Sequence, residues 1–244
     1  MKYFNYFYFL TISIFLFSCS NEQTQNVELK GNAMGTFYFI KLIDVPKKIK
    51  EEKLTLEINK TLLEINKIVS NWDNLSEISV LNSNKTLLPI KVSNNLLDVF
   101  KTANFIHIKS NGYFDITLDP IIDLWGFGYK KDKLKKKPPL KEDVLETLLL
   151  VNQKKYLEIN QSNNELIKKN KDVAFNLSAI GKGYGIDLIG KKLKNLKINN
   201  FLINIGGDIL TNGYNSKKQD WVIGIENPNL QQQYIKEIVN VTNK

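Results

Sequence analysis

Three aspartates lie among aromatic and aliphatic residues in one stretch of the chain, from Asn111 to Gly128. They are Asp115, Asp119 and Asp123. Carboxylates beside apolar side chains can form a ligand-binding or catalytic site, or they can hold a buried loop by accepting hydrogen bonds from nearby backbone amides. The residue types alone leave both interpretations open.

Glycine and proline residues shape this stretch. Gly112 precedes the acids, Gly126 and Gly128 follow them, and each tolerates a positive φ or the close approach of another segment. Pro120 lies between the acids, where it suits a turn or the first position of a helix. The stretch is therefore expected to turn at both ends.

The central part of the stretch resembles the signature of a known family. Its letters F-D-I-T-L-D-P-I-I-D-L-W-G-F-G are similar to a run found in the FAD:protein FMN transferase (ApbE) family. Further resembling motifs follow in family order: A-M-G-T at 33–36, S-N-W-D-N-L-S-E-I-S-V-L-N at 70–82, L-S-A-I-G-K-G-Y-G-I-D at 177–187, N-I-G-G-D-I at 204–209 and W-V-I-G-I-E-N-P at 221–228. The resemblance thus covers residues 33–228.

This resemblance implies an α+β fold, with mixed or antiparallel sheets flanked by helices. It also implies an enzyme that transfers FMN from FAD to a threonine of a partner flavoprotein and releases AMP. FAD would be the substrate, Mg²⁺ the cofactor, and an acceptor flavoprotein subunit the protein partner. Such a reaction depends on positioning and on neutralising the pyrophosphate charge, and no catalytic side chain is assigned.

The resemblance further implies which positions contact FAD. They are Met34, Trp72, Tyr113, Phe114, Asp115, Ser178 and Tyr184. The backbone carbonyl of Gly181 matches a Mg²⁺ ligand. Without the resemblance, Met34 could equally fill the core and Trp72 could pack on its own domain. A glycine-bearing turn that opens a helix favours an anion site at Gly181, although G-K-G alone is a weak signal.

The resemblance stops before the family's T-S-G-x-Y and H-I-I-D-P-x-T-G stretches and the late Asp and Thr that supply Mg²⁺ ligands. The chain as given is therefore expected to be C-terminally incomplete and to transfer little FMN, since one carbonyl with water and phosphate makes a poor Mg²⁺ site. Two alternative functions stay open: a non-catalytic flavin-binding lipoprotein, and Mg²⁺-dependent hydrolysis of FAD to FMN and AMP. A fragment, a split gene and a decayed copy all fit the sequence.

The N-terminus resembles a lipoprotein signal. Its apolar run from Tyr6 to Phe17 is short for a membrane span of about 20 residues and has the length of a signal-peptide core. We expect residues 1–18 to be a lipoprotein signal peptide and Cys19, the only cysteine, to be the lipidated N-terminus. Residues 19–32 would be the lipidated cysteine and a polar tether, and residues 33–244 the transferase domain. The protein would be anchored in the cell membrane and face the periplasm or the exterior.

Composition disfavours several other classes of protein. The formal charge is +9, but every basic residue is a lysine, and arginine is the usual bidentate reader of phosphate and guanine. No nucleic-acid partner is expected. His107 is the only histidine, so neither a zinc site nor a histidine-dependent nucleophile is supported. His107 itself is expected to be a surface or half-packed side chain.

The elements that must position these residues follow from hydrophobic periodicity. Helices are expected at 47–69, from a Ser93 cap to Ser110, at 144–150 and after Tyr184. The first has two apolar stripes, one of Ile49, Leu56 and Leu63 and one of Ile58, Leu62, Ile65 and Val69. Strands are expected at 34–43, 87–92, 173–177, 201–205, 208–211, 221–226 and 235–241, with a hairpin joining 156–159 to 165–168. The lysine-rich segment 130–140 is expected to be a solvated linker.

Overall fold

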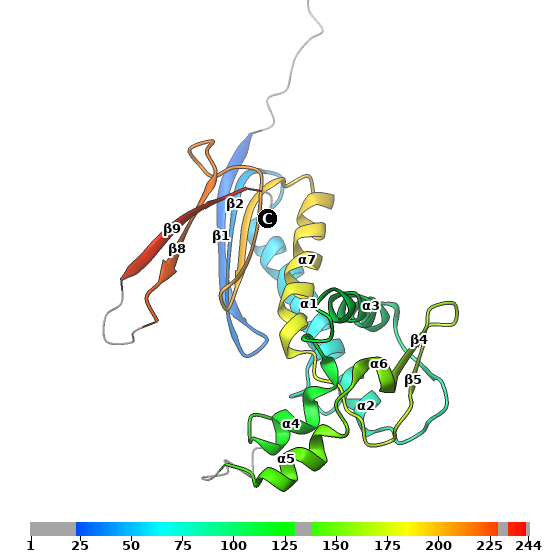
Figure 1. Ribbon diagram of the computed structural model, residues 1–244. Helices are drawn as coiled ribbons and strands as arrows, with labels where there is room; N and C mark the ends of the chain where they lie inside the picture. The colour runs from blue at the N-terminus through cyan, green and yellow to red at the C-terminus, as the bar shows by residue number, and fades with distance from the viewer. Residues whose placement is uncertain (1–22, 130–137, 229–233, 243–244) are drawn as a thin grey trace, which may run out of the picture.

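The computed structural model describes residues 23–129, 138–228 and 234–242 (Figure 1). The signal peptide expected at 1–18, the lipidation site expected at Cys19 and most of the linker expected at 130–140 lie outside these residues. Across the described ranges, no helix is both long enough and apolar enough to cross a bilayer.

Four antiparallel strands form the main sheet. They are β1 (Thr24–Ala33), β2 (Thr36–Pro46), β6 (Asn200–Ile205) and β7 (Asp208–Asn212), in the order β1-β2-β6-β7. Along β2 the buried residues Tyr38, Ile40 and Leu42 alternate with more exposed ones, which is the pattern of a strand that faces a core on one side. The strands expected at 34–43, 201–205 and 208–211 are confirmed.

The polar tether expected at 19–32 is wrong from Thr24 onward. This segment is strand β1, which pairs with β2 from Thr24 opposite Pro46 to Ala33 opposite Thr36. Val27 and Leu29 are buried in the core between the sheet and the helices. They are the only large apolar residues of the strand, and its other face is polar. The alternation of apolar and polar residues in the sequence is therefore too short to predict a strand clearly.

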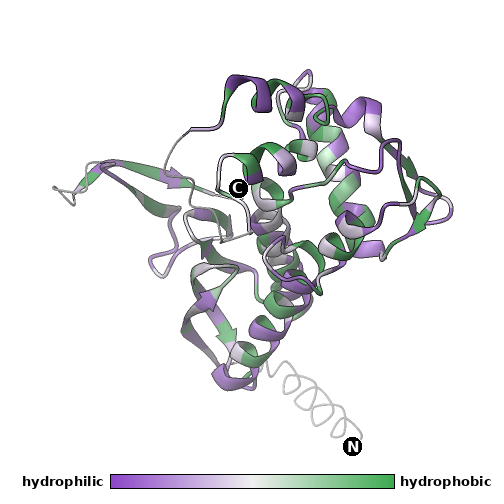
Figure 2. Ribbon diagram, turned by 90° about the horizontal axis from the view of Figure 1, so that it is seen from below, coloured by the Kyte–Doolittle hydropathy of each residue, from purple (hydrophilic) through white to green (hydrophobic). Residues whose placement is uncertain are grey.

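Helices α1 (Glu51–Val69) and α7 (Ser178–Asn195) cover one face of the main sheet (Figure 1). The buried stripe of α1 is Leu54, Ile58, Leu62, Ile65 and Val69, spaced three or four residues apart. The other stripe expected on this helix is wrong, because Leu56 and Leu63 are exposed. In Figure 2 the helices carry both green and purple residues, as amphipathic helices on a core do.

A second core lies around the C-terminal half of α1, where α2 (Glu77–Ser83) and α3 (Asn94–Lys109) pack. Both helices begin at serine caps: Ser76 Oγ accepts from the amide of Ser79 and Ser93 Oγ from the amide of Leu96, each at 3.1 Å. The Ser93 cap is confirmed. Phe100 of α3 meets Phe175 edge to face, with 5.1 Å between ring centroids.

Residues 173–177, expected to be a strand, form none. Val173, Phe175 and Leu177 are buried alternately, as in a strand, but asparagine side chains replace the neighbouring strand. The amide of Phe175 donates to Oδ1 of Asn82 at 2.8 Å, and the amide of Leu177 donates to Oδ1 of Asn71 at 3.1 Å. The alternation of apolar residues thus predicts correctly which side chains are buried. It does not show whether the backbone amides bond to a neighbouring strand or to side chains.

The stretch 111–128 forms the 3-10 helix η1 (Ile116–Leu118), followed directly by α4 (Asp119–Leu124). Pro120 lies in the first turn of α4, and Gly112 and Gly126 have positive φ of 86° and 82°, as expected. At Gly128 a Cβ would collide with the carboxylate of Asp123, so this glycine permits a close backbone approach.

The remaining elements are peripheral. Helix α5 (Lys141–Leu148) lies beside α4, and α6 (Gln153–Tyr156) leads into a small sheet of β3 (Ile90–Lys91), β5 (Glu165–Lys168) and β4 (Leu157–Asn160). The hairpin expected at 156–168 is confirmed, whereas the strand expected at 87–92 has only two residues. Strands β8 (Trp221–Glu226) and β9 (Ile235–Val241) form a hairpin, anchored by Trp221 against Ile43 and Leu202.

Candidate functional site

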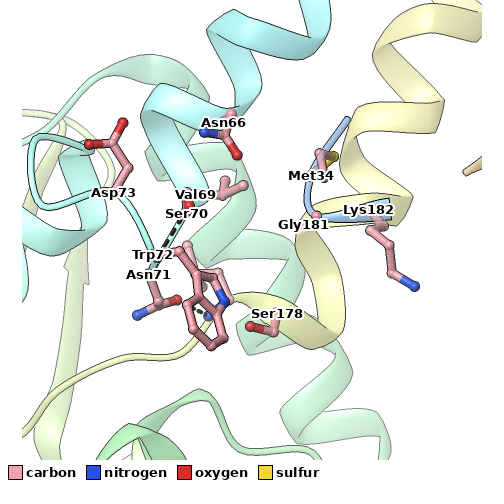
Figure 3. Close-up of a pocket in the computed structure, with 12 residues that line it drawn as sticks. Met34, Asn66, Val69, Ser70, Asn71, Trp72, Asp73, Ser178, Gly181 and Lys182 are labelled. Atoms are coloured by element: carbon pink, nitrogen blue, oxygen red, sulfur yellow. Dashed lines mark hydrogen bonds between the residues drawn. The ribbon is translucent and has the colours of Figure 1, made fainter. Parts of the chain in front are cut away.

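A cavity of about 640 Å³ opens where three segments that are distant in sequence meet (Figure 3). The turn between β1 and β2 supplies Met34 and Gly35. The end of α1 and the loop after it supply Asn66, Val69, Ser70, Asn71, Trp72 and Asp73, and the start of α7 supplies Leu177, Ser178, Gly181 and Lys182. The cavity therefore lies at the N-terminal end of α7.

The turn that carries Met34 approaches α7 closely. Met34 and Gly35 both have positive φ, 53° and 75°, which suits a two-residue hairpin connection but is uncommon for methionine. A Cβ on Gly181 would lie 3.7 Å from Cε of Met34 and 3.0 Å from Cγ2 of Val69. Gly181 thus leaves room for the apolar wall that Met34 and Val69 form.

Trp72 provides the aromatic surface of the cavity. Its side chain lies beside Ser178 in Figure 3, and the residue is 58% exposed. Its backbone amide donates to Oγ of Ser70 at 3.2 Å, which helps to hold the loop after α1. An exposed indole at the edge of a cavity can stack on a flat aromatic ligand.

Positive charge comes from Lys182 and from the end of helix α7. Lys182 lines the cavity, and its Nζ lies 2.9 Å from Oδ2 of Asp208 at the start of β7. The first residue of α7, Ser178, also lines the cavity, at the helix end where the dipole is positive. An anionic group is therefore favoured here.

The glycine-bearing turn expected at Gly181 is wrong in its local geometry. Gly181 and Gly183 lie inside α7, and the amide of Gly181 already donates to the carbonyl oxygen of Leu177 at 2.8 Å. The amide of Ser178 likewise donates to Oδ1 of Asn176 at 3.0 Å. Attraction for an anion thus comes from the helix end and from Lys182 rather than from free glycine amides.

The structure brings some of the predicted site residues together and leaves others apart. Met34, Trp72, Ser178 and Gly181 line the cavity, whereas Tyr113, Phe114, Asp115 and Tyr184 are not among its lining residues. Tyr113 is 93% exposed, and Phe114 packs against the second core. Tyr184 also packs there, and burial, together with the charge of Asp98, raises the pKa of its phenol.

Asp115 serves as a brace between helices. Its Oδ1 accepts from the amide of Thr117 at 2.8 Å and thereby caps η1, and its Oδ2 accepts from the amide of Gln153 at 2.9 Å. His107 lies beside it, with Nδ1 4.0 Å from Oδ2 of Asp115 and 2.7 Å from the carbonyl oxygen of Phe114. The expectation of a surface or half-packed His107 is wrong, because the residue is buried under this loop.

Sequence reasoning does not single out Lys182 or Asn71, both of which line the cavity. The signal for Lys182 is present, since it is the only cation of the G-K-G motif at the start of a helix. Asn71 carries no comparable signal, because an asparagine in a polar loop reads as solvated.

The family model for the ApbE family matches residues 34–244. The chain belongs to the ApbE family. Its α+β fold is accordingly the family's fold, and the resemblance in the motifs at 33–36, 70–82 and 177–187 is explained by shared descent.

Two curated relatives are named FAD:protein FMN transferase. The protein from Vibrio cholerae is 31% identical over 231 residues, which is 93% of this chain and 66% of the relative. The protein from Haemophilus influenzae is 32% identical over 222 residues, which is 90% of this chain and 63% of the relative. The chain thus spans about two thirds of the length of these ApbE relatives.

Solved ApbE structures have the same fold. The flavin transferase ApbE from Vibrio cholerae superimposes with a TM-score of 0.82 at 31% identity, covering 91% of this chain and 70% of that one. The apo form of the flavinyl transferase ApbE from Pseudomonas stutzeri, at 24% identity, gives a TM-score of 0.78 and supports the fold alone.

A Mg²⁺ site does not fit the residues that the structure describes. No group of three or more His, Cys, Asp or Glu side chains that could hold a metal occurs among them. Gly181, the position matched to a carbonyl ligand, lies within α7, where helical geometry directs its carbonyl to the next turn. Mg²⁺ prefers near-octahedral oxygen ligands, so the described part of the chain offers too few.

Proposed function

We propose that this protein transfers FMN from FAD to a threonine hydroxyl of a partner flavoprotein and releases AMP. The proposal is carried by one observation: Met34, Trp72, Ser178 and Lys182 come from three separate ApbE motifs and line one cavity. This cavity combines an apolar and aromatic wall with a cationic end, as a flavin dinucleotide requires. The relatives named FAD:protein FMN transferase support the same activity.

The flavin ring would occupy the apolar side of the cavity. The exposed face of Trp72 can stack on the isoalloxazine, and Met34 and Val69, which both lie close to Gly181, add an apolar wall. These contacts bind the ring without specifying the acceptor protein. They would hold the FMN half of the molecule in a fixed orientation, which is a large part of catalysis by positioning.

The pyrophosphate would lie at the cationic side. Lys182 and the N-terminal end of α7 place positive charge where the phosphates carry negative charge, and Ser178 adds a hydroxyl donor. In the reaction, the threonine oxygen forms a bond to the FMN phosphorus and the anhydride P–O bond breaks. AMP leaves with the bridging oxygen, and the hydroxyl proton is released. Stabilising the charge on the leaving phosphate is the contribution expected of Lys182.

Two further features of the proposal rest on the resemblance. One is a Mg²⁺ ion, which would assist charge neutralisation at the pyrophosphate; the described residues lack a fitting set of ligands, and the steps above use only the chain's own groups. The other is membrane attachment through a lipid on Cys19, which would place the enzyme and its acceptor at the same membrane surface.

The test uses the full chain, FAD, Mg²⁺ and an acceptor domain that carries the target threonine. Transfer is read as flavin fluorescence that stays with the acceptor in a denaturing gel, and AMP release is measured in parallel. A second arm uses the chain extended at its C-terminus by the remaining segment of the Vibrio cholerae relative. The control acceptor has valine in place of the threonine.

Labelling in either arm that disappears with the valine acceptor supports the proposal. If both arms bind FAD without labelling the acceptor, the protein is a flavin-binding protein and the proposed transfer is refuted. AMP release that does not depend on the acceptor, and leaves it unlabelled, would indicate hydrolysis of FAD and would refute it as well.

A further inference from the structure

Asn71 lies between two residues of the cavity wall and is itself almost completely buried. Ser70 and Trp72 line the cavity on either side of it, and Asn71 is only 4% exposed. Its side chain is directed across the fold to a segment more than a hundred residues away. A buried amide in this position must have its hydrogen bonds satisfied by that segment.

Asn71 bonds to the segment that leads into α7. Its Oδ1 accepts from the amide of Leu177 at 3.1 Å, and its Nδ2 donates to the carbonyl oxygen of Phe175 at 2.8 Å. Leu177 is the last residue before α7, whose first residue is Ser178. One side chain therefore ties the loop that carries Trp72 to the helix end that carries Ser178.

A buried carboxylate completes the connection. Oδ1 of Asp119 accepts from Nδ2 of Asn176 at 2.9 Å and lies 3.4 Å from Nδ2 of Asn71. Oδ1 of Asn176 in turn accepts from the amide of Ser178 at 3.0 Å. Asp119 is 7% exposed, so the relay from Asn71 begins in the interior, and it reaches the surface at Ser178.

We infer that Asn71 is a positioning residue, which sets the separation between the Trp72 indole and the N-terminal end of α7. This inference rests on the proposed function, since those two features would hold the flavin ring and the phosphates. Both walls depend on the same amide, so its loss should misplace them relative to each other. Asn71 also lines the cavity, but both groups of its side-chain amide bond to the segment before α7, so its replacement acts mainly by displacing the two walls.

The chain offers a matched control in Asn82. Nδ2 of Asn82 donates to the carbonyl oxygen of Phe175 at 2.8 Å and its Oδ1 accepts from the amide of Phe175 at 2.8 Å. Asn82 thus braces the same segment as Asn71 with two hydrogen bonds of similar length. It does not line the cavity and bonds neither to Leu177 nor to a neighbour of Trp72.

The experiment compares Asn71→Ala and Asn82→Ala in the full chain with wild type. Urea unfolding measures stability, calorimetry measures the Kd for FAD, and the visible absorbance and fluorescence of saturated FAD report stacking on the indole. Both variants should be less stable than wild type, because each loses buried hydrogen bonds. Only Asn71→Ala should raise the Kd by about tenfold or more and reduce flavin quenching at saturation, whereas Asn82→Ala should change the Kd by less than about twofold.

The inference is overturned if folded Asn71→Ala binds FAD with wild-type Kd and quenching, or if Asn82→Ala weakens binding equally. Should Asn71→Ala fail to fold, Asn71→Ser replaces it, since a hydroxyl cannot bridge Leu177 and Phe175 with two separate groups. Failure of wild type to bind FAD would refute the proposed function and with it the inference. If wild type binds FAD but does not transfer FMN, the proposed function fails, and the Kd and quenching of the two variants still decide whether Asn71 is a positioning residue.

Discussion

Nζ of Lys182 lies 2.9 Å from Oδ2 of Asp208, so an ion pair joins the first turns of α7 to the start of β7 at the edge of the cavity. Both side chains are partly exposed, and such pairs contribute about 0–1 kcal/mol to stability. The ion pair therefore keeps Lys182 near the cavity, but it is weak enough for Lys182 to contact another anion as well. An anion in the cavity can share it.

Replacing Lys182 by methionine should weaken FAD binding. The apolar stem is retained and the charge is lost, so a charge-assisted contact of about 1.5–3 kcal/mol should disappear from the binding free energy measured by calorimetry. Lys191→Met is the control, because Lys191 is an exposed lysine of the same helix that does not line the cavity. Equal losses in the two variants would show that net charge, and not the position of Lys182, determines affinity.

Replacing Asp115 by alanine should lower stability. The amides of Thr117 and Gln153 lose their acceptor in a nearly buried place, which should reduce the free energy of unfolding by about 1–3 kcal/mol in urea titrations. Asp98→Ala is the control, since Asp98 is exposed and pairs with Lys101 of its own helix. If Asp115→Ala leaves unfolding unchanged and weakens FAD binding, Asp115 contacts the ligand and its bracing role is minor.

Lys168 should make stability depend on alkaline pH. This lysine is 0% exposed, and Nζ donates to the carbonyl oxygens of Leu81 and Asn84 near the end of α2. Burial, with a smaller effect of Lys85, lowers the pKa of the Lys168 ammonium. Between that lowered pKa and the ordinary lysine value of about 10.4, the unfolded chain binds more protons, so the free energy of unfolding rises with pH.

The measurement is urea unfolding of wild type and Lys168→Met at a series of pH values from neutrality to about 10.4. The wild type should gain stability relative to the variant as pH rises through the window, and the difference should be constant below it. Lys169→Met, at an exposed lysine paired with Glu158, should show no such pH-dependent difference. A constant difference for Lys168→Met across the whole range would mean that the pKa of Lys168 is ordinary.

Cys19 should be the lipid-modified N-terminus of the mature protein. Mass spectrometry of protein expressed in a bacterial host should find a diacylglycerol group on Cys19, and Cys19→Ala should leave an unprocessed precursor. Ser18→Ala, which keeps the cysteine, serves as the control and should still be processed. Wild-type protein that retains residues 1–18 and carries no lipid would contradict the prediction.

The long amphipathic helices and the family could be predicted from the sequence. Helices α1, α3 and α7 repeat apolar residues at spacings of three and four over several turns, and β8 and β9 match the strands expected at 221–226 and 235–241. These features depend on the spacing of residues within one segment, which is visible in the sequence of that segment alone. The motifs that identify the ApbE family are local in the same sense.

Only the tertiary structure decided which polar residues form the cavity and which hold it together. Asp115 and Trp72 lie in motifs of equal clarity, yet Trp72 lines the cavity and Asp115 braces η1 and α6. Strand β1 depends on pairing with β2, and the segment 173–177 depends on asparagines 93 and 106 residues away. A hydrogen bond between residues so far apart leaves no periodic trace in either segment, because its donor and acceptor meet only when the chain has folded.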